Sequence, residues 1–216
     1  MMKRIFILCL LVFMLFGCTK ISNDNISIII NKIIENENNK YNEYRIGYKY
    51  YLPSGINIDK NNDFNVIFYK NNVKYYMYVD VVSYYYNVKK EYKVKDDAYL
   101  SMSINKDDKY GYLEINESNN KYLIEIMYNY AKIEVIVEEN DICHAITDSM
   151  LILSSIKFND DIIKSMLEED VLNYSEESFN IFDTDTNESN FLKVIEEFDN
   201  YSEEEVPDYD LINWGE

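Results

Sequence analysis

Apolar residues recur at helical spacing in two short stretches near the ends of the region 26–158. The first stretch is rich in isoleucine, and its spacing of three to four residues predicts a short amphipathic helix. Asp24 or Asn25 is the expected N-cap of this helix. The second stretch begins near Asp141 and ends at about Ile152, with Asn140 or Asp141 as its cap. The spacing is set by Ile26, Ile29, Ile30, Ile33 and Ile34 in the first helix, and by Ile142, Ala145, Ile146, Ser149, Met150 and Leu153 in the second.

Between these helices the pattern changes to the two-residue period of β-strands. Residues 121–128 and 131–137 alternate apolar with polar side chains, which indicates a sheet with one face buried and the other toward water. Residues 64–69 and 73–82 are separated by a short polar turn and are predicted to form a hairpin. The six predicted strands are residues 44–52, 64–69, 73–82, 110–115, 121–128 and 131–137.

Two segments fit neither pattern clearly. Residues 84–99 are polar and aromatic, and we expect a loop that extends beyond the sheet edge. Residues 153–158 can either finish the second helix or form a last short strand. Because one run of strands with helices at its ends is typical of an α+β domain, the sequence predicts an antiparallel sheet of about six strands with helices packed on one face.

The layout of this domain resembles that of PsbP-type domains. The resemblance rests on Tyr-Tyr-Leu-Pro-Ser-Gly at 50–55, on the strand meander that follows, and on the helix leading into Leu-Ser-Ser-Ile-Lys-Phe at 153–158. It covers roughly residues 44–158 and includes no diagnostic motif. The resemblance implies a binding or assembly module, because PsbP-type domains are mostly of that kind and share no catalytic residues.

Charge divides the chain at about residue 158. The formal net charge is −18, but residues 159–216 hold 19 acidic residues against two basic ones, while residues 1–158 are nearly neutral. We therefore expect an acidic C-terminal extension over residues 159–216. Apolar spacing at 162–171 and 191–198 indicates that this extension is partly helical. Two interpretations stay open: a solvated extension, or a segment that docks on a partner protein with a basic surface.

The first twenty residues have the layout of a secretory signal. Two basic residues precede an uncharged apolar run at 5–16, which is shorter than the ~20 residues that span a membrane. The run leads into Leu-Phe-Gly-Cys at 15–18, which resembles the lipobox of bacterial lipoproteins, although Phe16 is larger than the residue usual in that family. The resemblance implies that Cys18 receives diacylglycerol and that the signal is cut between Gly17 and Cys18.

This interpretation divides the chain into a signal peptide (1–17), a tether (18–25), the α+β domain (26–158) and the acidic extension (159–216). Lipids on Cys18 would hold the mature protein on the extracytoplasmic side of the cell membrane, because two or more acyl chains anchor a protein firmly. An ordinary cleaved signal peptide and an uncleaved N-terminal anchor are the alternatives.

Few residues have the chemistry of an enzyme or a metal site. His144 is the only histidine and follows Cys143, and adjacent helical residues do not face each other, so a catalytic Cys–His pair is not expected. One histidine and one unmodified cysteine do not supply a structural zinc site. The acidic balance argues against nucleic-acid binding, which requires a basic surface. We therefore expect no catalytic residue, no metal and no cofactor.

The 22 tyrosines include the remaining candidates for a binding surface. Tyr75, Tyr84, Tyr85 and Tyr86 are candidates for an aromatic platform for a sugar or a peptide, because rings give a large contact area at low entropic cost. The codon preference of an AT-rich genome is the alternative reason for so many tyrosines. We expect a non-enzymatic lipoprotein that binds another envelope component through the α+β domain, the acidic extension or both. The alternative function is the binding of a small ligand or carbohydrate on a tyrosine-rich sheet face.

Overall fold

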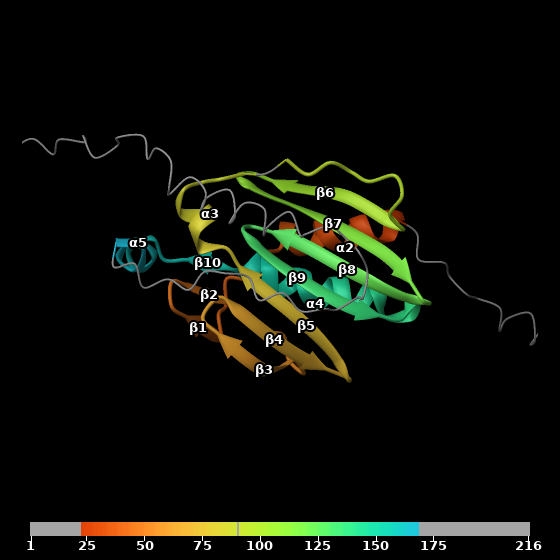
Figure 1. Cartoon of the computed structure of the whole chain (residues 1–216), viewed down its shortest axis with the longest axis horizontal. Helices are drawn as coiled ribbons and strands as arrows, with labels where there is room; N and C mark the ends of the chain where they lie inside the picture. Colours follow the sequence, from red (N-terminus) through yellow and green to blue (C-terminus); the bar gives the residue numbers. More distant parts are fainter. Residues whose placement is uncertain (1–22, 90, 169–216) are drawn as a thin grey trace, which may run out of the picture.

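The computed structural model describes residues 23–89 and 91–168 (Figure 1). The predicted signal peptide, Gly17 and Cys18, and residues 169–216 of the acidic extension lie outside the described residues. The described part has the predicted α+β class. Its helices are α2 (Asn23–Glu35), α3 (Val81–Tyr85), α4 (Ile142–Ser155) and α5 (Asp160–Glu168), with a 3-10 turn at Glu139–Asp141. Its strands are β1 (Glu43–Arg45), β2 (Tyr48–Tyr50), β3 (Asn57–Asn62), β4 (Asn65–Lys70), β5 (Val73–Val79), β6 (Leu100–Lys106), β7 (Lys109–Ser118), β8 (Lys121–Tyr128), β9 (Ala131–Val137) and β10 (Lys157–Phe158).

The main sheet has seven antiparallel strands in the order β3-β4-β5-β9-β8-β7-β6. Three of its hairpins turn through two residues that both have positive φ, namely Asn71-Asn72, Asn119-Asn120 and Asn129-Tyr130. Positive φ at both central residues defines a type I′ turn, which matches the twist of the flanking strands and which asparagine adopts readily. These turns fix the register of β4 with β5, of β7 with β8, and of β8 with β9.

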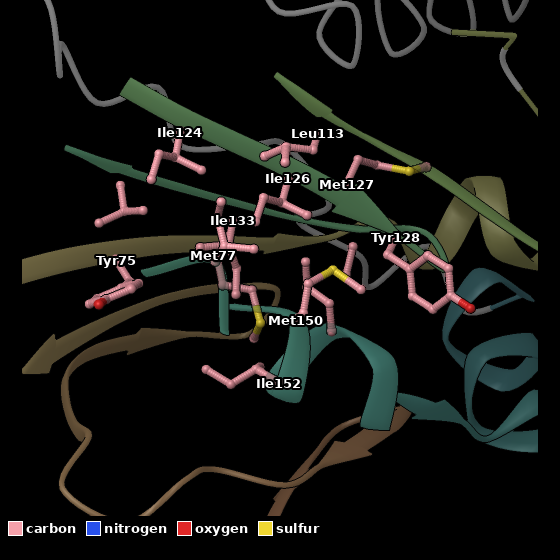
Figure 2. Close-up of a cluster of buried hydrophobic side chains, with 14 of the residues drawn as sticks. Tyr75, Met77, Leu113, Ile124, Ile126, Met127, Tyr128, Ile133, Met150 and Ile152 are labelled. Carbon is pink, nitrogen blue, oxygen red and sulfur yellow. The ribbon is translucent and has the colours of Figure 1, made fainter. Parts of the chain in front are cut away.

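One face of the main sheet packs against α4, and α2 lies beside α4 (Figure 1). Cross-strand pairing aligns one row of core residues on this face, and each of them is at most 2% exposed. Met150 of α4 is directed toward this row (Figure 2). Because burial of each such side chain contributes about 1.5–3 kcal/mol, this layer is the main source of stability. The row consists of Val66, Met77, Ile133, Ile126 and Leu113.

The small sheet contains β1, β2 and β10, with β2 in the centre. The prediction of one strand over residues 44–52 is therefore wrong in detail, because the chain turns through Ile46-Gly47 and pairs back on itself. Gly47 has a φ of +83°, which glycine adopts without the strain that a side chain would bring. Both alternatives for residues 153–158 are realised, since α4 ends at Ser155 and β10 follows it.

Two strands of the main sheet were not predicted, the edge strands β3 and β6, whereas the predicted strand over residues 44–52 belongs to the small sheet. Each has a single neighbouring strand, and β3 is polar with a register irregularity between Ile58 and Lys60, so its sequence lacks the expected alternation. The segment predicted as a loop from residue 84 overlaps a short helix, α3. Asp80 caps this helix, since its carboxylate accepts a hydrogen bond from the Ser83 amide at 2.8 Å.

Neither of the two long helices is capped by a side chain in the way that the sequence predicts. α2 begins at Asn23, so Asp24 and Asn25 lie inside the helix and do not cap it. Asp141 does occupy the N-cap position of α4, but its side chain makes no capping hydrogen bond. The chain enters α4 through a 3-10 turn, which leaves Asp141 with helical dihedral angles, whereas a capping side chain normally requires an extended backbone.

α5 packs on the domain, although its charge placed it in the predicted extension. Ile163 is fully buried, and the amide of Asn159 donates a hydrogen bond to the carbonyl of Gly47 at 2.8 Å. Asp160 and Asp161 are exposed in the first turn, where acidic residues favour the positive end of the helix dipole. Charge and packing therefore change at different residues, and the predicted boundary after residue 158 falls inside the packed structure.

Candidate functional site

The small sheet and α5 lie at one end of the domain (Figure 1). Residues at this end line a groove with a volume of about 890 Å³. Segments far apart in the sequence form its walls. They are residues 37–41 after α2, the β1–β2 hairpin, the turn at Asp108-Lys109, Tyr84 of α3, and residues 154–162 at the end of α4, in β10 and at the start of α5. A concave site of this size is large enough for a small molecule or a short polymer segment.

Aromatic rings form one wall of the groove. Tyr84 stacks on Phe158 with 3.8 Å between ring centroids and an interplanar angle of 17°. The ring of Tyr130 packs against Tyr84 in an edge-to-face arrangement, with an interplanar angle of 84°. The Tyr84 hydroxyl donates a hydrogen bond to Asp160 at 2.7 Å. Burial, followed by this bond to the carboxylate, raises the pKa of Tyr84 to about 12, so the ring stays neutral and acts as a donor.

Charged side chains on the rim are balanced. Lys109 contacts both carboxylate oxygens of Glu37 at 2.8 Å. The ammonium of Lys49 lies 4.3 Å from the ring centroid of Tyr41, within cation–π distance. The groove is lined by four basic residues and four acidic residues, so it has no strong preference for ligands of either sign. These are Arg45, Lys49, Lys109 and Lys157, and Glu37, Asp108, Asp160 and Asp161.

Backbone-to-side-chain hydrogen bonds hold the groove walls in place. Asn42 and Leu52 bond reciprocally, with the Asn42 amide donating to the Leu52 carbonyl and the Leu52 amide donating to Asn42. The Ser155 hydroxyl accepts a bond from the amide of Tyr51 at 2.8 Å, which ties the end of α4 to the small sheet. The Asn129 side chain donates to the carbonyl of Ile156 at 3.2 Å. The groove is therefore largely preformed.

The four tyrosines predicted as an aromatic platform do not share one surface. Tyr75 is 4% exposed on the α4 side of the sheet, so its ring is not accessible to a ligand. Tyr84 lines the groove, and Tyr85 is half-buried against the core. Tyr86 is exposed and meets the ring of Tyr85 edge to face. The platform fails as a unit because neighbours on α3 point in different directions and β5 directs Tyr75 into the core.

A row of three carboxylates crosses the other face of the main sheet, and the sequence pattern did not predict it. Glu114 of β7, Glu125 of β8 and Glu134 of β9 are direct cross-strand partners. Lys132 forms an ion pair with Glu134 at 2.8 Å. Burial raises the pKa of Glu125; Lys132 opposes this rise, and Glu134 adds to it.

Residues 91–99, here called the covering segment, lie over one end of this row. Tyr92 stacks on Tyr112 of β7 at 4.2 Å and donates a hydrogen bond to Glu114 at 2.8 Å. Glu114 also receives bonds from Lys95 at 2.9 Å and Asn116 at 2.8 Å. Burial raises the pKa of Glu114, but the bonds from these three side chains together outweigh burial and hold the pKa below its ordinary value.

The hairpin turns contain the signal that identifies this row. Two-residue turns at Asn119-Asn120 and Asn129-Tyr130 set the register, and counting back from them places the three glutamates opposite one another. In the sequence, Asn119-Asn120 is part of a longer polar stretch at 116–120, and the length of that stretch leaves the pairing of β7 with β8 open.

Cys143 and His144 lie in the first turn of α4. Cys143 is half-buried and its pKa is raised by burial, which disfavours the reactive thiolate, while His144 is exposed. Within residues 23–89 and 91–168, no cluster of three or more His, Cys, Asp or Glu side chains has an arrangement that holds a metal ion.

Comparisons of the chain with protein-family models, with curated proteins and with solved structures find no match. The lipobox and PsbP-type resemblances stay predictions that rest on the residues quoted for them. Across the two described ranges, none of the helices is both long and apolar enough to cross a membrane.

Proposed function

We propose that this chain is a lipid-anchored binding protein without catalytic activity, held on the extracytoplasmic side of the membrane through Cys18. Its α+β domain binds a neutral, hydroxyl-rich component of the bacterial envelope, a glycan segment, in the groove. The groove is the observation that carries this proposal.

The chemistry of the groove favours a glycan over a strongly charged ligand. Its basic and acidic side chains are equal in number, and its other polar side chains are four amides together with the hydroxyl groups of serine and tyrosine. Both kinds of group bond to sugar hydroxyls as donors and as acceptors. Rings of Tyr41, Tyr44 and Tyr84 line the same space and offer flat surfaces to the apolar faces of sugar rings. The amides belong to Asn38, Asn39, Asn129 and Asn159.

Calorimetric titration of the detergent-solubilised protein with soluble N-acetylhexosamine oligosaccharides tests the proposal. We expect saturable binding that changes little with salt, because the contacts are uncharged. Short anionic peptides and inorganic phosphate serve as competing ligand classes. Saturable binding of one of these, with none of the oligosaccharides, would overturn the glycan assignment.

Tyr44→Ala is the variant that locates binding in the groove. Tyr44 is 66% exposed, so its removal costs little stability, and loss of one ring contact worth about 1 kcal/mol should weaken binding roughly fivefold. Tyr69→Ala is the matched control, since Tyr69 is 38% exposed on β4 and does not line the groove. Equal weakening by both variants would place the binding site elsewhere.

A further inference from the structure

The face of the main sheet opposite α4 is here called the outer face. Its two halves differ in which other parts of the chain pack on them. On β6 and β7 the covering segment supplies contacts through Tyr92 and Lys95. On β3, β4, β5 and β9 no helix of the described part supplies a layer, since α4 and α2 lie on the opposite face (Figure 1).

This second half is apolar in its centre. Cross-strand pairing places Ile67 opposite Tyr76 on the outer face, and Ile136 of β9 belongs to the same face. Ile67 is only 7% exposed, which is the burial of a core residue. A sheet face that carries large apolar side chains in this way is typical of a packed interface and not of a water-facing surface.

Lysines surround the apolar centre. Lys60 of β3 pairs with Ile67, Lys74 of β5 pairs with Tyr69, and both lysines are exposed. Lys132 of β9 belongs to the same face, but it is only 1% exposed and forms an ion pair with Glu134. Lys74 is likewise paired with Asp59. This half of the outer face therefore presents apolar side chains beside two exposed ammonium groups, with the carboxylates of Asp59 and Glu134 among them.

The part of the chain that follows α5 has the complementary composition. Residues 169–216 hold sixteen acidic residues against one lysine, and Phe191, Leu192, Val194, Ile195 and Phe198 recur at helical spacing. Forty-eight residues span about 70 Å even as a continuous helix at 1.5 Å per residue, so the length is sufficient to reach any point of the sheet from Glu168.

We propose that residues 169–216 dock on the outer face over β3, β4, β5 and β9 of the same molecule. The apolar run at 191–198 covers Ile67, Tyr76 and Ile136, and neighbouring carboxylates lie near Lys60 and Lys74. This assignment does not depend on the glycan proposal, because the groove lies at the end of the domain and not on this face.

Zero-length carbodiimide cross-linking of the full chain, followed by peptide mass spectrometry, tests the docking. The reagent joins a lysine to a carboxylate only when the two are in contact. We expect Lys60 and Lys74 to couple to carboxylates within 169–216, and the exposed Lys32 and Lys40 on the helix side not to couple to them. The link between Lys74 and Asp59, which lie 3.0 Å apart, is the internal positive control.

A mixture of isotope-labelled and unlabelled protein identifies the occupant. Links within one isotope class support docking in the same molecule, and mixed links show that a second copy covers the face, which would overturn the proposal. Ile136→Ala should reduce the yield of the expected links, while Ile28→Ala, at a site 51% exposed on α2, should leave it unchanged. Links spread evenly over lysines of all faces, with the Lys74–Asp59 link intact, would also contradict the docking.

Discussion

The side chain of Ile163 in α5 packs directly over Gly47 in the β1–β2 turn. A Cβ atom built on Gly47 would lie 2.9 Å from Cγ1 of Ile163, so the helix seats against a residue that has no side chain. The hydrogen bond from the Asn159 amide to the Gly47 carbonyl fixes the same contact from the backbone. This contact makes α5 part of the domain and sets one wall of the groove.

Gly47→Ala should destabilise the protein by about 2–3 kcal/mol in urea denaturation. A φ of +83° costs a residue with a side chain about 1–2 kcal/mol, and the clash with Ile163 adds to this cost. Gly55→Ala is the matched control, since Gly55 has a φ of +86° with nothing within 4 Å of the added Cβ. Equal losses in the two variants would show that the contact with Ile163 contributes nothing.

Glu114→Gln should loosen the covering segment and lower stability by about 1–2 kcal/mol at pH 7, because a charged acceptor of three hydrogen bonds is lost. Hydrogen exchange of residues 91–99 should become faster. Glu117→Gln, an exposed site on the same strand, is the control and should change neither quantity.

The pH dependence of the Glu114 contribution has a defined sign. Its folded-state pKa is lowered, so its contribution is fully present above the ordinary value of 4.5 and is lost as the pH falls through the folded-state value. The stability difference between wild type and Glu114→Gln should therefore shrink only in acid. A difference that already disappears near neutral pH would contradict the assigned role of the carboxylate.

Glu125→Gln, in contrast to Glu114→Gln, should raise the stability of the protein at pH 7. The folded-state pKa of Glu125 is raised, so the wild type loses stability as the pH rises from 4.5 through the folded-state value. Glutamine can still accept the hydrogen bond from Tyr112 without the buried charge. Denaturation at several pH values should show the variant's advantage growing from acid to neutral pH. Glu138→Gln, at an exposed site, should show no such trend.

Cys18→Ser should release the protein from the membrane fraction, because under the proposed lipid anchoring that thiol is the attachment point of the lipid that supplies the anchoring energy. Fractionation with detergent-phase partitioning measures the change. Cys143→Ser is the control and should remain with the membrane. A Cys18→Ser protein that stays membrane-bound with unchanged electrophoretic mobility would contradict lipid anchoring.

The central strands were predictable because their two faces meet different surroundings. Ile124 and Ile126 alternate with Glu125, and this alternation survives in the structure as core face against outer face. β3 was not predictable in this way. It lies at an edge, its side chains are mostly exposed, and its polar sequence reads as a loop.

The periodicity of the sequence could not predict the groove. Tyr84 and Phe158 are 74 residues apart and become neighbours only after β10 pairs with β2, a long-range pairing of two residues per strand. A local pattern cannot specify such a contact. The tyrosine motif at 84–86 identified one groove residue, while the other walls come from ordinary charged and amide residues.

The direction of α2 has a consequence for how the domain stands on a membrane. Glu37, just after α2, lines the groove, and α2 runs about 20 Å away from it, so the helix begins at the opposite end of the sheet (Figure 1). Five residue steps from Cys18 to Asn23 span at most about 18 Å. An anchor at Cys18 would thus keep the start of α2 close to the bilayer and turn the mouth of the groove outward. Its ligand would then approach from the side that faces away from that membrane.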